Sequence, residues 1–329
     1  MAQHDYNIAN ADGATVRADL NSALLATVSL NSGATEPATK FAYQWWADTT
    51  VNVLKQRNTA NNAWLERAPL GALRFDDFPR SHLAGLTLSN GTDATNDIDI
   101  AMGAARNAAD DGNLALAAAA GKQIDVTWAA GGTPGAPTGG LSSSLTLTND
   151  TWYHVFLILV SGTVEVGFDT SLTAANLITD HGATKYRRIG SVLRGTATNE
   201  PFSQVGDEFL WDTPVGDYES DNPGTSATTH TLTVPTGLQV TVIHTVSLAE
   251  NGATGQNDVL ITSLDQNDTA PSVTRRDLST QNGSESDSAR FHIRTSTSGQ
   301  IRTRGTRSVT NTKNTGTTHG WVDTRGRDA

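Results

Sequence analysis

The longest apolar run in the chain, Trp152–Val160, limits most strongly what the chain can fold into. It is rich in aromatic and β-branched residues, Ser161-Gly162 ends it, and Val164–Phe168 then alternates apolar with other residues. Nine residues are too few to span a bilayer, which needs about 20. Periodicity alone also fits a buried helix, but the Ser-Gly turn and the alternating partner favour a hairpin over Thr151–Thr170, at the centre of a β-sandwich.

The composition agrees with a chain of many short strands. Of 329 residues, 37% are hydrophobic, 17% are charged and 30 are Gly, which is too apolar for wholesale disorder. The length allows two or three domains. With no Cys, neither disulfides nor thiolate metal sites are expected. Residues 1–17 lack the basic and apolar segments of a signal peptide, so we expect no such signal and no membrane insertion.

The formal net charge of −11 argues against a general nucleic-acid binder. The charge is uneven: residues 271–329 contain 10 Lys and Arg against 5 Asp and Glu, and the remaining residues contain 13 against 29. A basic segment on an acidic body can meet an anionic surface. The alternative is that these arginines lie on solvated strand faces.

One helix is predicted, over Ala11–Asn31, because apolar residues recur there at every fourth position: Val16, Leu20, Leu24 and Val28. Asp12 or Thr15 can cap its start, and Asn31-Ser32-Gly33 ends it. A helix of this length cannot bury its apolar face alone. It must therefore pack on a small sheet or on copies of itself in an oligomer.

The small sheet is predicted directly after the helix. Phe41–Thr50 reads as a strand and Val51–Asn58 as its partner across a turn near Asp48–Asn52, with a second turn at Asn58–Asn62. Ala68–Gly71 reads as a linker. Residues 1–70 are therefore predicted to form an N-terminal module of a helix plus a hairpin.

Short strands separated by turns continue to the end of the chain, which favours two β-sandwich or jelly-roll-like domains, residues 71–220 and 221–329, around a linker at Asp217–Ser226. Ala101–Gly121 is expected to form two strands across the Asp110–Asn113 turn, Ala130–Ser144 a surface loop, and Phe291–Arg304 a hairpin. Further strands are expected at Leu83–Leu88, Asp97–Ile100, Lys122–Ala130, Tyr186–Leu193, Gln204–Trp211, Thr229–Val234, Leu238–Leu248, Asp258–Leu264, Ala289–Thr295, Gln300–Thr306 and Gly320–Asp323.

Catalytic motifs are absent from the sequence: there is no G-x-S-x-G, HExxH, GxxxxGK[ST] or GxGxxG before a helix. His154, inside the apolar run, is either a base or, as we favour, a structural histidine. The pairs Asp76-Asp77 and Asp207-Glu208 are poor glycosidase dyads, because neighbours on a strand point to opposite faces. We therefore expect no enzyme, although carboxylates from different strands can still meet.

Two further groups carry candidate chemistry. Asp93, Asp97 and Asp99 supply oxygen ligands suited to Ca²⁺, but their spacing fits no EF-hand, and ordinary turn carboxylates are the favoured reading, so we expect no metal and no cofactor. Exposed tryptophans stack on sugars, whereas buried ones belong to cores or trimer interfaces. The tryptophans in question are Trp45 and Trp46, which should point to opposite strand faces, and Trp128, Trp211 and Trp321.

The segment ADGATVRADLNSALLATVSLNSGATEPATKFAYQWWADTT, with LKQRNTANNAW after it, resembles a module at the start of tail-fibre proteins of tailed bacteriophages. The strings TNDIDIAMGAA, TWYHVFLILVSGTVEVGFDTS, KYRRIGSVL and GWVDTRGRDA are similar to the body and C-terminus of such fibres. Together these segments touch most of the chain. Many fibres carry a long repetitive shaft, which this sequence lacks, so a short fibre, a spike or another particle-bound protein fits.

The resemblance implies a virion protein of the tail, assembled in the host cytoplasm and acting outside the cell. It implies a homotrimer that docks on a tail or baseplate protein through residues 1–70 and binds a host surface glycan or outer-envelope receptor. Candidate receptor residues are Trp321, with Arg302, Arg304 and Arg307 as partners for anionic glycans. The alternatives are a structural baseplate or head-decoration protein and a glycan-degrading tailspike.

Overall fold

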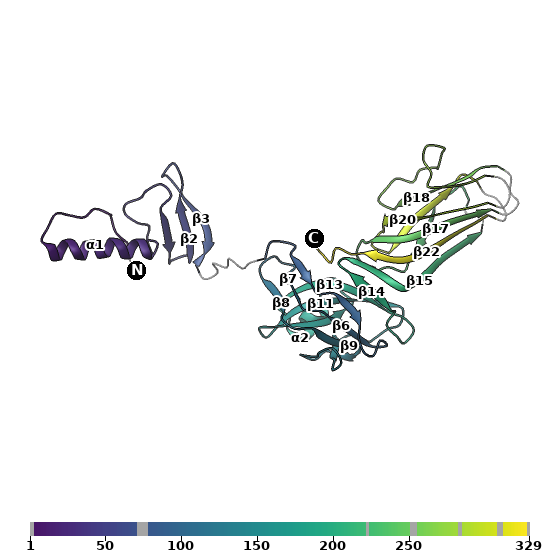
Figure 1. The fold of residues 1–329 in the computed structure, drawn as a ribbon, viewed down its shortest axis with the longest axis horizontal. Helices are drawn as coiled ribbons and strands as arrows, with labels where there is room; N and C mark the ends of the chain where they lie inside the picture. The colour runs from purple at the N-terminus through teal and green to yellow at the C-terminus, as the bar shows by residue number, and fades with distance from the viewer. Residues whose placement is uncertain are drawn as a thin grey trace. The chain divides into compact units, whose positions relative to one another are not determined.

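The computed structural model describes residues 3–70, 78–221, 224–250, 255–281, 285–307 and 312–327. The chain divides into two compact units, Met1–Asp77 and Phe78–Ala329. The described residues are mainly β, with two short helices, and Figure 1 labels many of their elements. No helix within the described ranges is long and apolar enough to cross a membrane.

The first unit consists of a helix and a small antiparallel sheet. Helix α1 (Gly13–Val28) begins after Asp12, whose carboxylate accepts the N–H groups of Ala14 and Thr15 at 2.9 and 3.1 Å. This confirms the predicted helix and one of its two proposed caps. The sheet has the order β1-β2-β3 and confirms the predicted hairpin. Its strands are β1 (Trp45–Asp48), β2 (Val53–Arg57) and β3 (Trp64–Pro69).

Helix α1 carries apolar side chains on two faces, and only one face is covered within the chain. The covered face presents Ala23 and Ala26, both buried. The stripe predicted from the fourfold spacing points outward: Leu20, Leu24 and Val28 are 48, 56 and 81% exposed. Small residues thus make the internal contact, while the large apolar residues remain at the surface.

Polar contacts to Asn31 link the end of α1 to the sheet. The side chain of Asn31 is buried, donates to the carbonyl of Trp45 at 3.0 Å and accepts from the hydroxyl of Tyr6 at 2.5 Å. Trp46 is buried beside it, whereas Trp45 is partly exposed, which confirms that the two tryptophans point to opposite strand faces.

The second unit contains a seven-stranded sheet of order β13-β11-β12-β10-β9-β6-β5. Its centre is the predicted hairpin, in which β11 and β12 pair antiparallel from His154–Asp169 to Val160–Thr163. The strands are β5 (Leu88–Asn90), β6 (Asp97–Ile100), β9 (Ala120–Thr127), β10 (Thr138–Leu141), β11 (Thr151–Val160), β12 (Thr163–Asp169) and β13 (Lys185–Arg194).

Two elements of this region differ from the sequence prediction. Ala130–Ser144 is not all loop, because Thr138–Leu141 forms β10, which runs parallel to both β9 and β12. A second helix, α2 (Ala175–His181), follows β12 and was not predicted. Its first N–H groups, from Asn176 and Leu177, are accepted at 2.9 and 3.1 Å by the carboxylate of Asp169, at the end of β12.

Three smaller sheets complete the unit, with orders β4-β7-β8, β14-β15-β22-β17-β20 and β16-β21-β18-β19. The pairing of β7 with β8 confirms two strands within Ala101–Gly121. The strands are β4 (Leu83–Gly85), β7 (Gly103–Arg106), β8 (Asn113–Leu116), β14 (Phe202–Val205), β15 (Glu208–Asp221), β16 (Thr228–Thr231), β17 (Thr241–Glu250), β18 (Asn257–Ser263), β19 (Leu278–Thr280), β20 (Ser286–Arg294), β21 (Gln300–Gly305) and β22 (Thr312–Val322).

Three predictions in this part were wrong. Phe291–Arg304 is not a hairpin, because β20 pairs with β17 while β21 pairs with β16 and β18 in another sheet. Gln204–Trp211 is not one strand, because a turn at Gly206 divides it into the paired strands β14 and β15. The predicted linker Asp217–Ser226 begins inside β15, which continues to Asp221 and so crosses the predicted border between residues 220 and 221.

One cluster of buried apolar residues joins the sheets of the second unit. Leu114 of β8, Val155 of β11, Phe209 of β15 and Ile301 of β21 are all completely buried members of this cluster. A shared core of this kind positions the loops and turns at its rim, where the polar clusters described next are found.

Candidate functional site

Trp321, a candidate receptor residue, lies in β22 and is completely buried. Its indole stacks on Phe209 with 5.1 Å between ring centroids, and the rings of Trp152 and Trp211 lie at 5.3 and 4.9 Å. Such aromatic clusters stabilise a core through buried area and ring contacts. Trp321 therefore acts as a core residue and offers no ring face to a ligand.

Arg302 and Arg304 lie on one face of β21, as their spacing predicts, and Arg307 follows that strand. Both strand arginines are already bonded within the unit. Arg302 donates to the Gln266 carbonyl at 2.6 Å, and Arg304 pairs with Asp268 at 3.0 Å. These contacts occupy part of each guanidinium.

The predicted acidic groups are engaged elsewhere or lie outside the described ranges. Asp76-Asp77 falls among residues that the structure does not describe. Asp207 pairs with Arg325 at 3.1 Å and with Arg327, so two arginines balance its charge.

The candidate calcium ligands lie in the turn before β6 and in β6 itself. Asp93 accepts the N–H of Thr95 at 3.1 Å, and its own N–H donates to Asp97 at 3.3 Å. Burial, and then the charge of Asp97, raise the pKa of Asp99. Across the described part of the chain, no group of three or more His, Asp or Glu side chains could hold a metal ion.

His154 belongs to a closed polar network in the core. Its Nδ1 lies 2.8 Å from the hydroxyl of Ser191, and Arg188 donates to that hydroxyl at 3.2 Å and to both carboxylate oxygens of Asp323 at 2.6 Å. Burial, and then the charge of Arg188, lower the pKa of His154 to about 4. Ser191 is completely buried, so no substrate reaches this serine–histidine pair and the histidine is structural.

A cavity of about 510 Å³ borders this network, a size typical of small-ligand sites. Strand β13 contributes Tyr186, Arg187 and Arg188, and the turn after β22 contributes Arg325 and Gly326. Sequence analysis did not select these residues, although the consecutive arginines of KYRRIGSVL, inside a predicted strand, were a signal.

Strand β13 contributes two consecutive arginines to the cavity, and a bulge follows them in the strand. Val155 pairs with Gly190 and Phe156 with Arg188, so Ile189 has no residue opposite it. The bulge changes the alternation of side chains after the two arginines, which themselves pair regularly with Leu157 and Phe156. Both Arg187 and Arg188 line the cavity and are buried.

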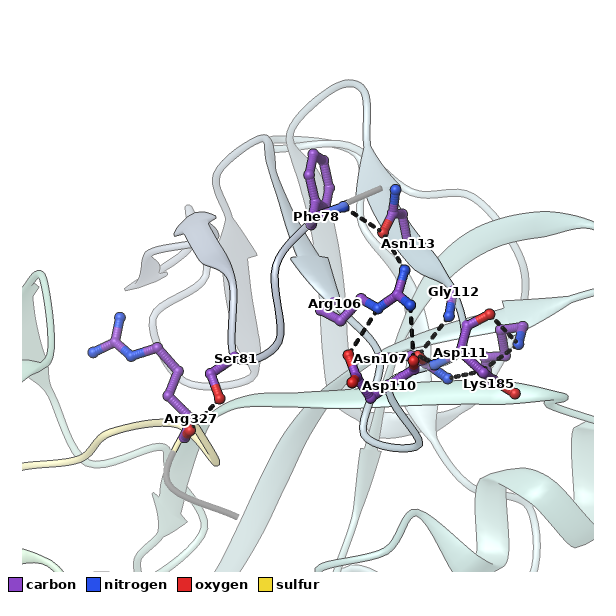
Figure 2. Close-up of polar contacts among 10 residues, drawn as sticks. All are labelled: Phe78, Ser81, Arg106, Asn107, Asp110, Asp111, Gly112, Asn113, Lys185 and Arg327. Atoms are coloured by element: carbon purple, nitrogen blue, oxygen red, sulfur yellow. Dashed lines mark hydrogen bonds and ion pairs between the residues drawn. The ribbon is translucent and has the colours of Figure 1, made fainter. Parts of the chain in front are cut away.

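Polar contacts fix the turn between β7 and β8, which supplies another part of the wall through Ala108. The N–H of Ala108 donates to the Tyr186 carbonyl at 2.9 Å. Figure 2 shows how Arg106 contacts Asp110, and how Lys185 of β13 pairs with Asp111. The turn is thereby held directly against the strand that carries the arginines.

The C-terminal turn is fixed just as firmly. Ser81 donates to the carbonyl of Arg327, as Figure 2 shows. The backbone N–H of Arg325 donates to Asp323 at 2.7 Å, and the Arg325 guanidinium reaches the carbonyl of Leu86 at 3.3 Å. The cavity therefore has walls that are held in place before any ligand arrives.

Comparison of the sequence with models of known protein families, and with curated proteins, finds no match. The functional argument consequently depends on the residues and the geometry described above.

Proposed function

We propose that the chain is a tail-fibre or receptor-binding protein of a tailed bacteriophage that attaches the particle to a host surface glycan without catalysis. In this proposal, residues 1–70 dock on a tail or baseplate protein, the rest forms two β-sandwich-like domains, and three copies assemble. The protein would be made in the host cytoplasm and act on the outside of the cell as part of the virion tail.

The observation that carries this proposal is the exposed apolar stripe of α1, formed by Leu20, Leu24 and Val28. Large apolar side chains aligned along a helix are costly to leave in water. Three copies of α1 around a common axis would bury the stripe, as in helical oligomers. A separate unit with such a surface suits attachment, and it leaves the larger unit available for binding.

Binding rather than catalysis is favoured by the second unit. Its serine–histidine pair is closed off in the core, and the carboxylate of Asp207 is neutralised by arginines. Several identical weak sites on one particle would give strong attachment through avidity when the geometry permits simultaneous contact.

The test uses the purified full chain, with its mass in solution measured alongside the binding of labelled protein to intact host cells. We expect a trimer that binds saturably and is displaced by host envelope glycan. The double variant Leu20→Ser/Leu24→Ser should remain folded but lose assembly and bind cells more weakly. Ala18→Ser, at an exposed position outside the stripe, is the matched control and should behave as the parent.

Two results would redirect the proposal. A folded trimer that does not bind cells would indicate a structural baseplate or head-decoration protein. Release of oligosaccharide from host envelope would indicate a glycan-degrading spike.

A further inference from the structure

Arg187 is a buried cation without an acceptor. Its side chain is 5% exposed, and its Nε and Nη2 atoms are buried with no hydrogen-bond partner among the described residues. A buried charged group that lacks a partner destabilises the fold, because its lost hydration is not replaced. The neighbouring Arg188, by contrast, is paired, because it donates to both carboxylate oxygens of Asp323.

The surroundings of Arg187 are positive. Burial, and then the charges of Arg188, Arg327 and Arg325, lower the pKa of Arg187. Among the described residues, these four arginines are accompanied by two paired carboxylates, Asp323 for Arg188 and Asp207 for the other two. The described part of the cluster thus has more arginines than paired carboxylates beside the cavity that Arg187 lines.

The cavity has room next to the guanidinium because residue 326 is Gly. Its φ of +73° suits glycine, and a Cβ there would lie 3.9 Å from the guanidinium carbon of Arg187. The other walls combine apolar surface from Leu172 and Leu238 with polar groups from Gln239 and Thr324. Apolar walls with a few polar groups suit a ligand that has C–H faces and hydroxyls.

We propose that this cavity binds the carboxylate of an acidic saccharide residue, with the guanidinium of Arg187 as the main donor. This deepens the proposed function, on which it rests, by naming the ligand class and the site. A guanidinium carries paired N–H groups that match the two oxygens of a carboxylate. Apolar contacts from Leu172 and Leu238 would cover one face of the sugar ring.

Calorimetric titration of the full chain with glucuronate, glucose and inorganic phosphate tests the inference. Glucuronate should bind, whereas glucose, which lacks the carboxylate, should bind at least about tenfold more weakly. Phosphate, a tetrahedral anion without a ring, should also bind more weakly than glucuronate.

Variants of Arg187 locate the site. Arg187→Met should weaken glucuronate binding by about tenfold or more, since a charge-assisted hydrogen-bonded pair is lost. Arg187→Lys keeps the charge but not the paired donors, and should give an intermediate loss. Arg302→Met, which removes an arginine outside the cavity, is the matched control and should leave binding unchanged.

Stability provides an independent readout. Since Arg187 is buried without a partner, Arg187→Met should raise the unfolding temperature while it abolishes binding. A lower unfolding temperature would mean that Arg187 has an acceptor within the chain, and would overturn the inference. Equal binding of glucuronate and phosphate would identify a general anion site and would also overturn it.

The outcomes separate this inference from the proposed function. Saturable binding to host cells that Arg187→Met leaves intact would overturn the cavity as the receptor site and retain the fibre. Arg187-dependent glucuronate binding by a chain that does not bind cells would support the cavity and reject the fibre.

Discussion

The two units of the chain place their apolar and polar side chains in opposite ways. In the first unit, α1 exposes Leu24 and Val28 while a polar side chain, Asn31, makes the buried link to the sheet. In the second unit, most large apolar residues are inside, and even charged groups such as Arg188 and Asp323 are buried and paired.

This difference indicates different sources of stability. The second unit has a shared core across several sheets, so burial of its own apolar surface stabilises it. The first unit keeps a large part of its apolar surface outside and depends on a few local hydrogen bonds. It is the unit with most to gain from a partner surface.

Acidic pH should produce the clearest difference in stability between the two units. Burial lowers the pKa of His154, His230 and His244 to about 4, with further contributions from Arg188 at His154 and from His230 and His319 at His244. An unfolded histidine has a pKa near 6.5, so the unfolded chain binds protons first as the pH falls.

The stability from these histidines is therefore complete above pH 6.5 and is lost as the pH falls toward 4. The slope is about 1.4 kcal/mol per pH unit for each histidine, or several kcal/mol in total. Urea unfolding at pH 7 and pH 5, followed by fluorescence, measures it. Equal stability at the two pH values would contradict the buried neutral state, and His154→Gln should reduce the slope.

Breaking the buried ion pair of the second unit should have the next largest effect on the free energy of unfolding. Arg188→Met leaves the Asp323 carboxylate buried without its partner, which typically costs about 3–5 kcal/mol. Hydrogen exchange should show faster opening of β13 and β22 while α1 is unchanged. Lys313→Met breaks an exposed pair with Glu219 and is the control, with little effect expected.

In the first unit, Asn31→Ala should destabilise by about 1–3 kcal/mol, because the Trp45 carbonyl and the Tyr6 hydroxyl lose their partner. Asn31 also has a left-handed backbone, with φ of 52°. Asn31→Gly removes only the hydrogen bonds and should therefore cost less than Asn31→Ala. Protection of α1 against hydrogen exchange measures both variants, and equal losses would contradict this account.

The smallest effect is expected at the helix cap. Asp12→Ala removes the acceptor for the N–H groups of Ala14 and Thr15. Fraying should be confined to the first turn of α1, where hydrogen exchange would become faster. Asp12→Ser, which restores a capping oxygen, should recover most of the protection. Slower exchange in Asp12→Ala would contradict the assigned cap.

Local signals explain what the sequence predicted well. The cap at Asp12 and the Ser161-Gly162 turn lie next to the elements that they define. Helix α2 lacked such a signal, since its capping carboxylate, Asp169, belongs to the preceding strand. Strand β10 was not predicted because of its glycines. A Cβ at Gly139 would lie 1.9 Å from the Thr127 carbonyl oxygen, so the close packing of the strands requires glycine there. A glycine-rich sequence, however, is typical of a loop.

The candidate site was harder to predict for a related reason. Arg302 and Arg304 were selected as partners for anionic glycans, but neighbouring strands and loops supply hydrogen-bond partners for both side chains. Arg187 stands out only because tertiary structure buries it without an acceptor. Whether an arginine is paired depends on residues far away in sequence, such as Asp323 for Arg188.

Strand β22 also constrains the order in which the second unit can be completed. It lies between β15 and β17, and neither of these strands pairs with the other. During synthesis, both strands therefore present an unpaired edge until Thr312–Val322 has left the ribosome. Open edges of this kind promote aggregation, so a chain interrupted before Thr312 should precipitate more readily than the full chain.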